Sequence, residues 1–336
     1  MTRPITIVGG GLAGLGLALA LRQRGIPVTL HEKRRYPFHR VCGEFLSGVS
    51  NTLLSRLQIE DCFAGAAPIR SMRWFVRDRL VLDRDLPRPA WGISRYTLDE
   101  RLSIRAIEAG ADLRTGSTFR GGDREGLVRA SGKRLDRQSD WLGLSAHFEN
   151  VANGSLEMHC GPDGYLGMSP IENGRMNVTG LFRKQPGVMG RSHELISSYL
   201  RVIRCEQLAA RLEAARFVPG SFAAIAGFDF GFQRSDGFCL GDRSLLIPPF
   251  AGNGMSMAIE AAAQAAPLLT EYAKGSINWS KARDNFKRTQ NDCFGPRMRT
   301  AARLHPFLFS PTGLRLLGTL AANGILPTER LFKSLR

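Results

Sequence analysis

The chain has 336 residues, 43% of them hydrophobic and 23% charged, so it can bury a large core as ordinary globular proteins do. Of its 46 basic residues, seven are lysine and 39 are arginine, and the formal net charge is +16. These residues are scattered, with no basic stripe interleaved with aromatic residues, so the charge does not indicate a nucleic-acid partner. The spacing of the cysteines and histidines predicts no metal site and no disulfide framework, which favours a reducing, cytoplasmic location.

The N-terminal segment contains a complete dinucleotide-binding signature. The apolar run at residues 5–8 predicts a buried strand, a helix is predicted from Leu15 to Arg24, and a second strand follows over Val28–Glu32. Between the first strand and the helix lies a G-x-G-x-x-G pattern. The glycines of this pattern are Gly9, Gly11 and Gly14.

Each part of this unit has a physical role. Gly9 permits a tight turn, Gly11 lets the backbone approach a pyrophosphate, and Gly14 lets the helix pack closely on the sheet. The helix N-terminus offers free N–H groups to the phosphates, and Glu32 can accept hydrogen bonds from ribose hydroxyls. The unit predicts NAD or FAD without choosing between them.

A second segment, from Gly241 to Ala258, favours FAD. Here a Gly-Asp pair ends a short strand, a proline-containing loop follows, and the turn Gly252–Gly254 begins an alanine-rich helix. This order resembles the second FAD motif of the flavin-dependent hydroxylase superfamily, which also includes geranylgeranyl reductases and flavin halogenases. The resemblance implies that Asp242 contacts the ribityl or ribose part of FAD and that the helix N-terminus faces the pyrimidine edge of the flavin.

Two further segments carry the same resemblance. Residues 40–47 are similar to the C-G-x-x-L-S stretch of geranylgeranyl-reductase-like flavoproteins, which implies that Arg40 meets a phosphate and that Cys42 and Gly43 border the flavin. Arg95 matches another cofactor-contacting position. The sequence also departs from the pattern, because Ala130–Lys133 stands where hydroxylases carry Asp-Gly, and the halogenase signature W-x-W-x-I-P is absent.

The predicted cofactor is FAD. NAD(P)H is expected to bind only transiently as the electron donor, because the sequence has no second glycine motif for a nicotinamide lobe. The catalytic acid or base is left unassigned. The predicted cofactor-binding residues are Gly9, Gly11, Leu12, Ala13, Gly14, Glu32, Lys33, Arg40, Cys42, Gly43, Arg95, Asp242, Pro249, Gly252, Asn253, Gly254 and Met255.

Two residues have more than one interpretation. Cys42 could be a redox thiol, a point of covalent flavin attachment, or a small residue beside the ring, and the last is favoured because nothing indicates a resolving partner. His147 lies in an apparent strand and could face a substrate pocket as an acid or base, or serve as a structural histidine.

The predicted fold is α/β. It consists of an FAD-binding, Rossmann-like lobe of the glutathione-reductase type, an inserted and mostly antiparallel β-sheet substrate lobe, and a helical C-terminal tail. The three parts are expected at residues 1–66, 96–138 and 236–296 for the FAD-binding lobe, 67–95 and 139–235 for the substrate lobe, and 297–336 for the tail.

The resemblance implies an FAD-dependent oxidoreductase, and the leading hypothesis is a monooxygenase acting on a hydrophobic small molecule. One alternative is a reductase that saturates alkene bonds of a prenyl or lipid substrate. Another is an electron-carrying flavoprotein without an organic substrate of its own, and a reductase could be a partner. The basic and apolar tail could cap the core or contact a membrane surface.

Overall fold

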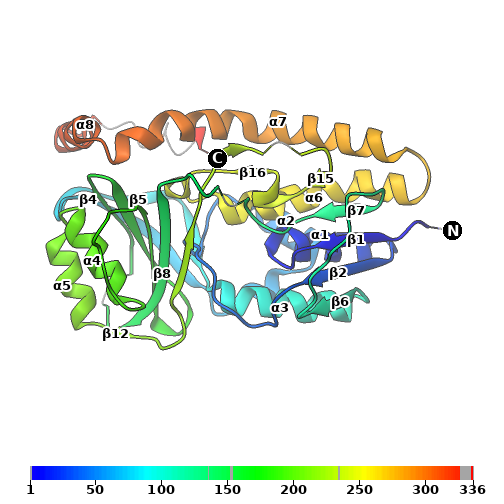
Figure 1. The fold of residues 1–336 in the computed structure, drawn as a ribbon, viewed down its shortest axis with the longest axis horizontal. Coiled ribbons are helices and arrows are strands. Elements are labelled where there is room, and N and C mark those ends of the chain that lie inside the picture. The colour runs from blue at the N-terminus through cyan, green and yellow to red at the C-terminus, as the bar shows by residue number, and fades with distance from the viewer. Residues whose placement is uncertain (1, 135, 152–153, 234, 326–333, 336) are drawn as a thin grey trace.

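The computed structural model describes residues 2–134, 136–151, 154–233, 235–325 and 334–335 (Figure 1). A five-stranded sheet, in which all neighbouring strands are parallel, forms one part of the molecule. Its order, β15-β7-β1-β2-β6, places the first strand in the centre. The strands are β1 (Ile5–Val8), β2 (Val28–Glu32), β6 (Asp112–Thr115), β7 (Leu127–Arg129) and β15 (Phe238–Cys239).

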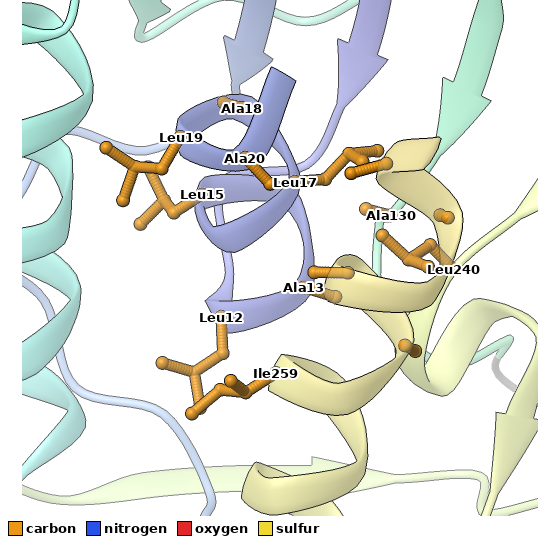
Figure 2. Close-up of a cluster of buried hydrophobic side chains, with 14 of the residues drawn as sticks. Leu12, Ala13, Leu15, Leu17, Ala18, Leu19, Ala20, Ala130, Leu240 and Ile259 are labelled. Carbon is orange, nitrogen blue, oxygen red and sulfur yellow. The ribbon is translucent and has the colours of Figure 1, made fainter. Parts of the chain in front are cut away.

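Helix α1 (Leu12–Arg22) is the central helix of this part, and every residue from Leu12 to Leu21 is buried. It packs between α3 (Arg95–Glu108) and α6 (Gly254–Ala273), and Figure 2 shows Leu12 pointing toward Ile259 of α6. The helix begins three residues before the predicted start at Leu15, because the second half of the glycine pattern forms its first turn. Nearby are the short elements α2 (Asn51–Leu57) and η1 (Glu60–Phe63).

A nine-stranded sheet forms the second part, with the order β12-β8-β11-β10-β9-β4-β5-β3 and with β13 also pairing with β8. All of its pairs are antiparallel except β4 with β9. The strands are β3 (Phe45–Leu46), β4 (Ala67–Val76), β5 (Arg79–Gly92), β8 (Trp141–Glu149), β9 (Leu156–Gly161), β10 (Gly164–Pro170), β11 (Met176–Arg183), β12 (Arg216–Phe217) and β13 (Ala223–Ala226).

Helices α4 (Glu194–Val202) and α5 (Glu206–Ala214) cover one face of this sheet. Alternate residues of the central strands, such as Leu144 of β8 and Leu166 of β10, point into a core shared with these helices. The residues between them point to the other face, toward the parallel sheet. The remaining elements are η2 (Glu172–Gly174), β14 (Gly231–Phe232), η3 (Gly241–Arg243), β16 (Leu245–Leu246) and η4 (Pro249–Ala251).

The C-terminal part consists of α7 (Trp279–Leu304), η5 (His305–Leu308) and α8 (Pro311–Ala322). Helix α7 runs along one side of the molecule from the parallel sheet toward the nine-stranded sheet (Figure 1). Leu308 and Leu314 are buried, so this segment is docked on the core. Among the described residues, none of the helices is both long and apolar enough to cross a bilayer.

The predicted fold class is confirmed. The domain boundaries stay a prediction. Two elements do not follow the expected boundaries. Strand β3 lies within the segment 1–66 yet pairs with β5 of the nine-stranded sheet. The expected start of the tail at residue 297 falls inside α7, because Pro296 does not end this helix. Residues 326–333 and 336 of the tail lie outside the described residues.

Candidate functional site

The glycine turn joins β1 to α1 in the manner that the sequence predicts. Gly9 has a φ of 111°, and a Cβ added there would lie 2.3 Å from the carbonyl oxygen of Ala130. A Cβ added at Gly14 would lie 1.9 Å from the Gly9 oxygen. At Gly11, by contrast, the nearest atom to an added Cβ is Arg95 Nη2 at 3.5 Å. Gly9 and Gly14 therefore permit close packing, whereas Gly11 leaves room beside a cationic side chain.

Glu32 ends β2 next to this turn. Its Oε2 accepts a hydrogen bond from the Gly10 N–H at 2.8 Å, and its Oε1 accepts one from the Arg34 N–H at 3.0 Å. The carboxylate is thus fixed at the end of the strand, where a ribose would lie. Of the other predicted residues here, Leu12 and Ala13 have buried side chains and can offer only backbone groups, and Lys33 is exposed.

Two arginines lie beside the glycine turn and share one carboxylate. Arg95 donates to both oxygens of Asp99 at 2.8 Å, and Arg40 Nε lies 2.9 Å from Asp99 Oδ2. Arg40 also lies 3.5 Å from Glu32 Oε2. Burial alone would lower the pKa of Arg95, but the Asp99 carboxylate raises it, so the guanidinium stays charged. Both predicted cations are therefore held where a pyrophosphate would approach Gly11.

The Gly-Asp motif is brought to the same place. Gly241 has a φ of 60°, and a Cβ there would lie 2.9 Å from the Cβ of Ala13 in α1. The Asp242 side chain is open to solvent, yet the surrounding protein raises its pKa, while Lys133, Arg95 and Arg40 act in the opposite direction. The motif that lies more than 200 residues after the glycine turn is thus its neighbour in the fold.

The N-terminus of α6 follows η4. Gly252 has a φ of 65°, and Gly254 is exposed with no atom within 4 Å of an added Cβ. The Asn253 side chain is 1% exposed, and its Oδ1 has no hydrogen-bond partner within the described part of the chain. Asp242 and Gly254 line one small cavity. Of the other two predicted residues in this segment, Pro249 is exposed, whereas Met255 is buried.

The Cys42–Gly43 turn is held by the nine-stranded sheet. The Cys42 carbonyl oxygen accepts hydrogen bonds from Asn177 Nδ2 at 2.9 Å and from Thr179 Oγ1 at 2.6 Å. Gly43 is exposed, with open space around an added Cβ. Burial raises the pKa of the Cys42 thiol, which disfavours the reactive thiolate and agrees with its interpretation as a small neutral residue.

Glu44 is a residue that the sequence did not single out. It has a φ of 51°, and its side chain accepts from the Arg95 N–H at 2.8 Å and lies 2.7 Å from His147 Nε2. Glu44 is 1% exposed and His147 is 3% exposed. This hydrogen-bonded pair connects the turn beside Cys42 to β8, which supports the interpretation of His147 as a structural histidine. Burial raises the pKa of Glu44.

An aromatic cluster lies between the nine-stranded sheet, the η4 loop and the C-terminal segment. His305 lies at its centre, with the Phe230 and Phe309 ring centroids 4.9 and 4.8 Å away. Burial lowers the pKa of His305 to about 4, so the ring is neutral. We call this the junction cluster, and its rings are Trp141, Tyr165, Phe228, Phe230, Phe250, His305 and Phe309.

The structure thus places most of the predicted residues around the glycine turn, Asp242 and the start of α6. The Cys42–Gly43 turn lies beside the nine-stranded sheet. The junction cluster was missed because its rings come from five separate segments, although the aromatic content of β8, β10 and the tail was a signal. Within the described residues, no group of three or more His, Cys, Asp or Glu side chains could hold a metal ion.

Residues 7–44 match the family described as an NAD(P)-binding Rossmann-like domain. The chain is 31% identical over 112 residues to a kynurenine 3-monooxygenase of Dictyostelium discoideum, a match that covers 30% of this chain and 24% of that protein. It is 31% identical over 150 residues to the FAD-dependent monooxygenase OpS4 of Beauveria bassiana, covering 40% of this chain and 35% of the relative. The matches thus span about a quarter to a third of these relatives.

Solved structures resemble nearly the whole chain. The flavin-dependent brominase Bmp2 superposes with a TM-score of 0.78 at 18% identity, covering 98% of this chain and 93% of that one. A geranylgeranyl bacteriochlorophyll reductase-like protein of Thermoplasma acidophilum gives 0.76 at 18% identity, with coverage of 99% and 95%. At this identity the likeness concerns the fold. The chain therefore shares its fold with these proteins, in agreement with the fold that its motifs predict.

Proposed function

We propose that the protein binds FAD and acts as a monooxygenase on a hydrophobic small molecule. The observation that carries this proposal is the meeting of the two predicted FAD motifs, at Gly9–Gly14 and at Gly241–Asp242, beside an apolar cluster of aromatic rings. The fold, and the monooxygenases that parts of the chain match, support the same function.

The residues present fit FAD. Gly11, Gly43 and Gly254 all leave space where a Cβ would otherwise stand, and the buried Asn253 Oδ1 lacks a partner in the described chain. Buried polar atoms are nearly always hydrogen-bonded, so a bound group that donates to Asn253 would complete the site. Glu32 and Asp242 would hold sugar hydroxyls, and Arg40 and Arg95 would face the phosphates.

When bound, the flavin would supply the redox and oxygen chemistry. The protein's own residues would orient the cofactor and exclude water. Helix α6 would direct its N-terminal dipole toward the flavin, which stabilises negative charge there. The junction cluster would cover the reaction centre with apolar rings, and a dry site is what protects a reactive intermediate from water.

Product analysis tests the monooxygenase activity. The purified protein would be incubated with NADPH and a panel of aromatic and polyprenyl compounds while oxygen consumption is recorded. We expect oxygen uptake coupled to a product heavier by one oxygen atom. Oxygen uptake without any oxygenated product would contradict the proposal.

A reductase that saturates alkenes is the second candidate. The stretch from Cys42 to Ser47 and the fold of the Thermoplasma protein favour it. In the same incubation, a product heavier by two hydrogen atoms, formed without oxygen uptake, would identify this activity. The apolar junction cluster favours an organic substrate over a flavoprotein that only carries electrons, because an electron carrier needs an exposed ring edge rather than aromatic side chains beside the flavin.

The electron donor is proposed to be NAD(P)H, either directly or through a reductase partner. A tight nicotinamide site would need its own phosphate-binding helix N-terminus, because flexible surface arginines contribute little net energy and are screened by salt. We expect slow flavin reduction that weakens further as ionic strength rises, measured by stopped-flow absorbance. Rapid reduction at micromolar donor, insensitive to salt, would show that a built nicotinamide site exists.

A further inference from the structure

Lys133 differs from the other described lysines of this chain, because it is half-buried whereas they are exposed. It follows β7 in the loop that stands where the hydroxylases carry Asp-Gly. The Ala130 N–H donates to the Val8 oxygen at 2.7 Å, and the Ala130 oxygen lies against Gly9. Figure 2 shows Ala130 close to α1 and α6. The loop that carries Lys133 is therefore fixed beside the phosphate-binding turn.

The same strand end also holds the Gly-Asp motif. The Arg129 oxygen accepts a hydrogen bond from the Leu240 N–H at 2.9 Å. The loop with Lys133 and the loop with Asp242 therefore begin next to each other, at the ends of the paired strands β7 and β15. The Lys133 ammonium lies 3.0 Å from the centroid of the Phe228 ring and is attracted by Asp242. Lys133 thus lies between the proposed sugar-binding acid and the junction cluster.

Three cations act on Asp242, and Lys133 has the largest effect. The other two, Arg95 and Arg40, are already engaged by the Asp99 carboxylate. An incoming dinucleotide brings a negatively charged pyrophosphate into this region. Lys133 is the cation beside Asp242 that has no carboxylate of its own at ion-pair distance within the described chain, so it is available to balance that charge.

We propose that Lys133 contacts bound FAD on the side facing Asp242 and takes up a proton when the dinucleotide binds. This inference rests on the proposed binding of FAD and adds a residue that the motifs do not assign. Enclosure lowers the pKa of Lys133 to about 7, so the free protein is only partly protonated near neutral pH. A nearby phosphate favours the charged form, so binding draws in a proton.

The groups that face Lys133 support this assignment of the titration. Asp242 is the charged group that acts on Lys133, and Arg95 and Arg40 act in turn on Asp242. The range from about pH 6 to about pH 8.5 spans the pKa of about 7 of Lys133, so the charge of its ammonium changes across it. If bound FAD raises the pKa of Lys133 by one unit, the affinity for FAD changes roughly tenfold across this pH range.

Flavin-free full-length protein would be titrated with FAD, following flavin fluorescence, at about pH 6 and about pH 8.5. Calorimetry in buffers of different ionisation enthalpy would count the protons taken up. For the wild type we expect the dissociation constant to rise about tenfold with pH and a fractional proton uptake near pH 7. Lys274→Met, which changes an exposed lysine, should behave in the same way.

Lys133→Met should bind FAD about tenfold more weakly at about pH 6, without pH dependence or proton uptake. Lys133→Arg should keep tight binding at both pH values, because an arginine stays charged. Proton uptake and pH dependence in Lys133→Met equal to those of the wild type would overturn the assignment. A wild type that binds no FAD at either pH would instead overturn the proposed function.

Discussion

Two buried Glu–His pairs lie on opposite faces of the nine-stranded sheet. Glu44 and His147 meet on the face toward the parallel sheet, 2.7 Å apart. Glu157 and His159 of β9 lie 3.2 Å apart on the other face, where Arg211 of α5 also contacts Glu157 at 2.7 Å. The strand register assigns these faces, because His147 pairs with Asn177, whereas His159 pairs with Leu166 of the helix-packed core.

The same two residue types therefore have different electrostatic surroundings. Burial alone would raise the pKa of Glu157, but the bonds to His159 and Arg211 lower it, so this carboxylate stays ionised. At Glu44, burial outweighs the bonds to His147 and the Arg95 N–H, and Glu172 adds to the effect, so its pKa is raised. The third, cationic partner Arg211 thus accompanies the lowered pKa of Glu157, whereas the carboxyl beside the Cys42 turn has a raised pKa.

The largest expected effect comes from removing each histidine. His147→Leu leaves the buried Glu44 carboxyl with the Arg95 N–H but without its histidine, and should lower the free energy of unfolding by about 3 kcal/mol. His159→Leu should lower it by only about 1–2 kcal/mol, because Arg211 still bonds to Glu157. Urea unfolding of the two matched variants measures both values. Equal losses would mean that Arg211 does not distinguish the pairs.

A smaller effect separates the two faces by cofactor affinity. Asp242→Ala should weaken FAD binding by about 1–3 kcal/mol, because a sugar hydroxyl of the bound cofactor loses its acceptor. Glu157→Gln, on the helix-packed face, should leave the affinity unchanged. Fluorescence titration of the two folded variants provides the comparison. Unchanged FAD affinity in folded Asp242→Ala would remove Asp242 from the cofactor site.

The smallest effect concerns pH. A lowered folded-state pKa, as at Glu157, stabilises the fold above the unfolded pKa of about 4.3 and loses this contribution as pH falls through the folded pKa. The raised pKa of Glu44 has the opposite sign, because its ionisation costs stability above the folded pKa. As pH rises from about 4 to about 7, the wild type should gain stability relative to Glu157→Gln and lose it relative to Glu44→Gln. Urea unfolding across this pH range measures the stability of the wild type and of both variants. A pH-dependent stability difference of the same sign for both variants would contradict the opposite pKa shifts of Glu44 and Glu157.

The sequence predicted the parts of the site that local patterns define. Gly9, Gly11 and Gly14 lie within six residues, and the Gly-Asp motif carries its own strand, loop and helix start. A turn of this kind is specified by backbone geometry that only a few residue types allow, so it can be recognised without knowing the rest of the fold. The N-terminal unit predicted a dinucleotide-binding α/β fold, and the resemblance that the motifs carry implied the inserted antiparallel sheet.

The remaining features depend on tertiary contacts. Glu44 and His147 are 103 residues apart, and Thr179 reaches the Cys42 carbonyl across 137 residues. Neither pairing has a periodic signal. The continuation of α7 through Pro296 also depends on packing, because Phe294 and Met298 are buried on either side of the proline and hold the helix to the core.

The central claim is that this chain holds FAD between the glycine turn and the Gly-Asp motif. The most direct test is to release the cofactor from purified protein, or from protein reconstituted with flavins, and to identify it by chromatography and mass. The account predicts FAD, because Glu32 is placed for an adenosine ribose that FMN lacks. Recovery of FMN alone, or of no flavin after reconstitution, would contradict it.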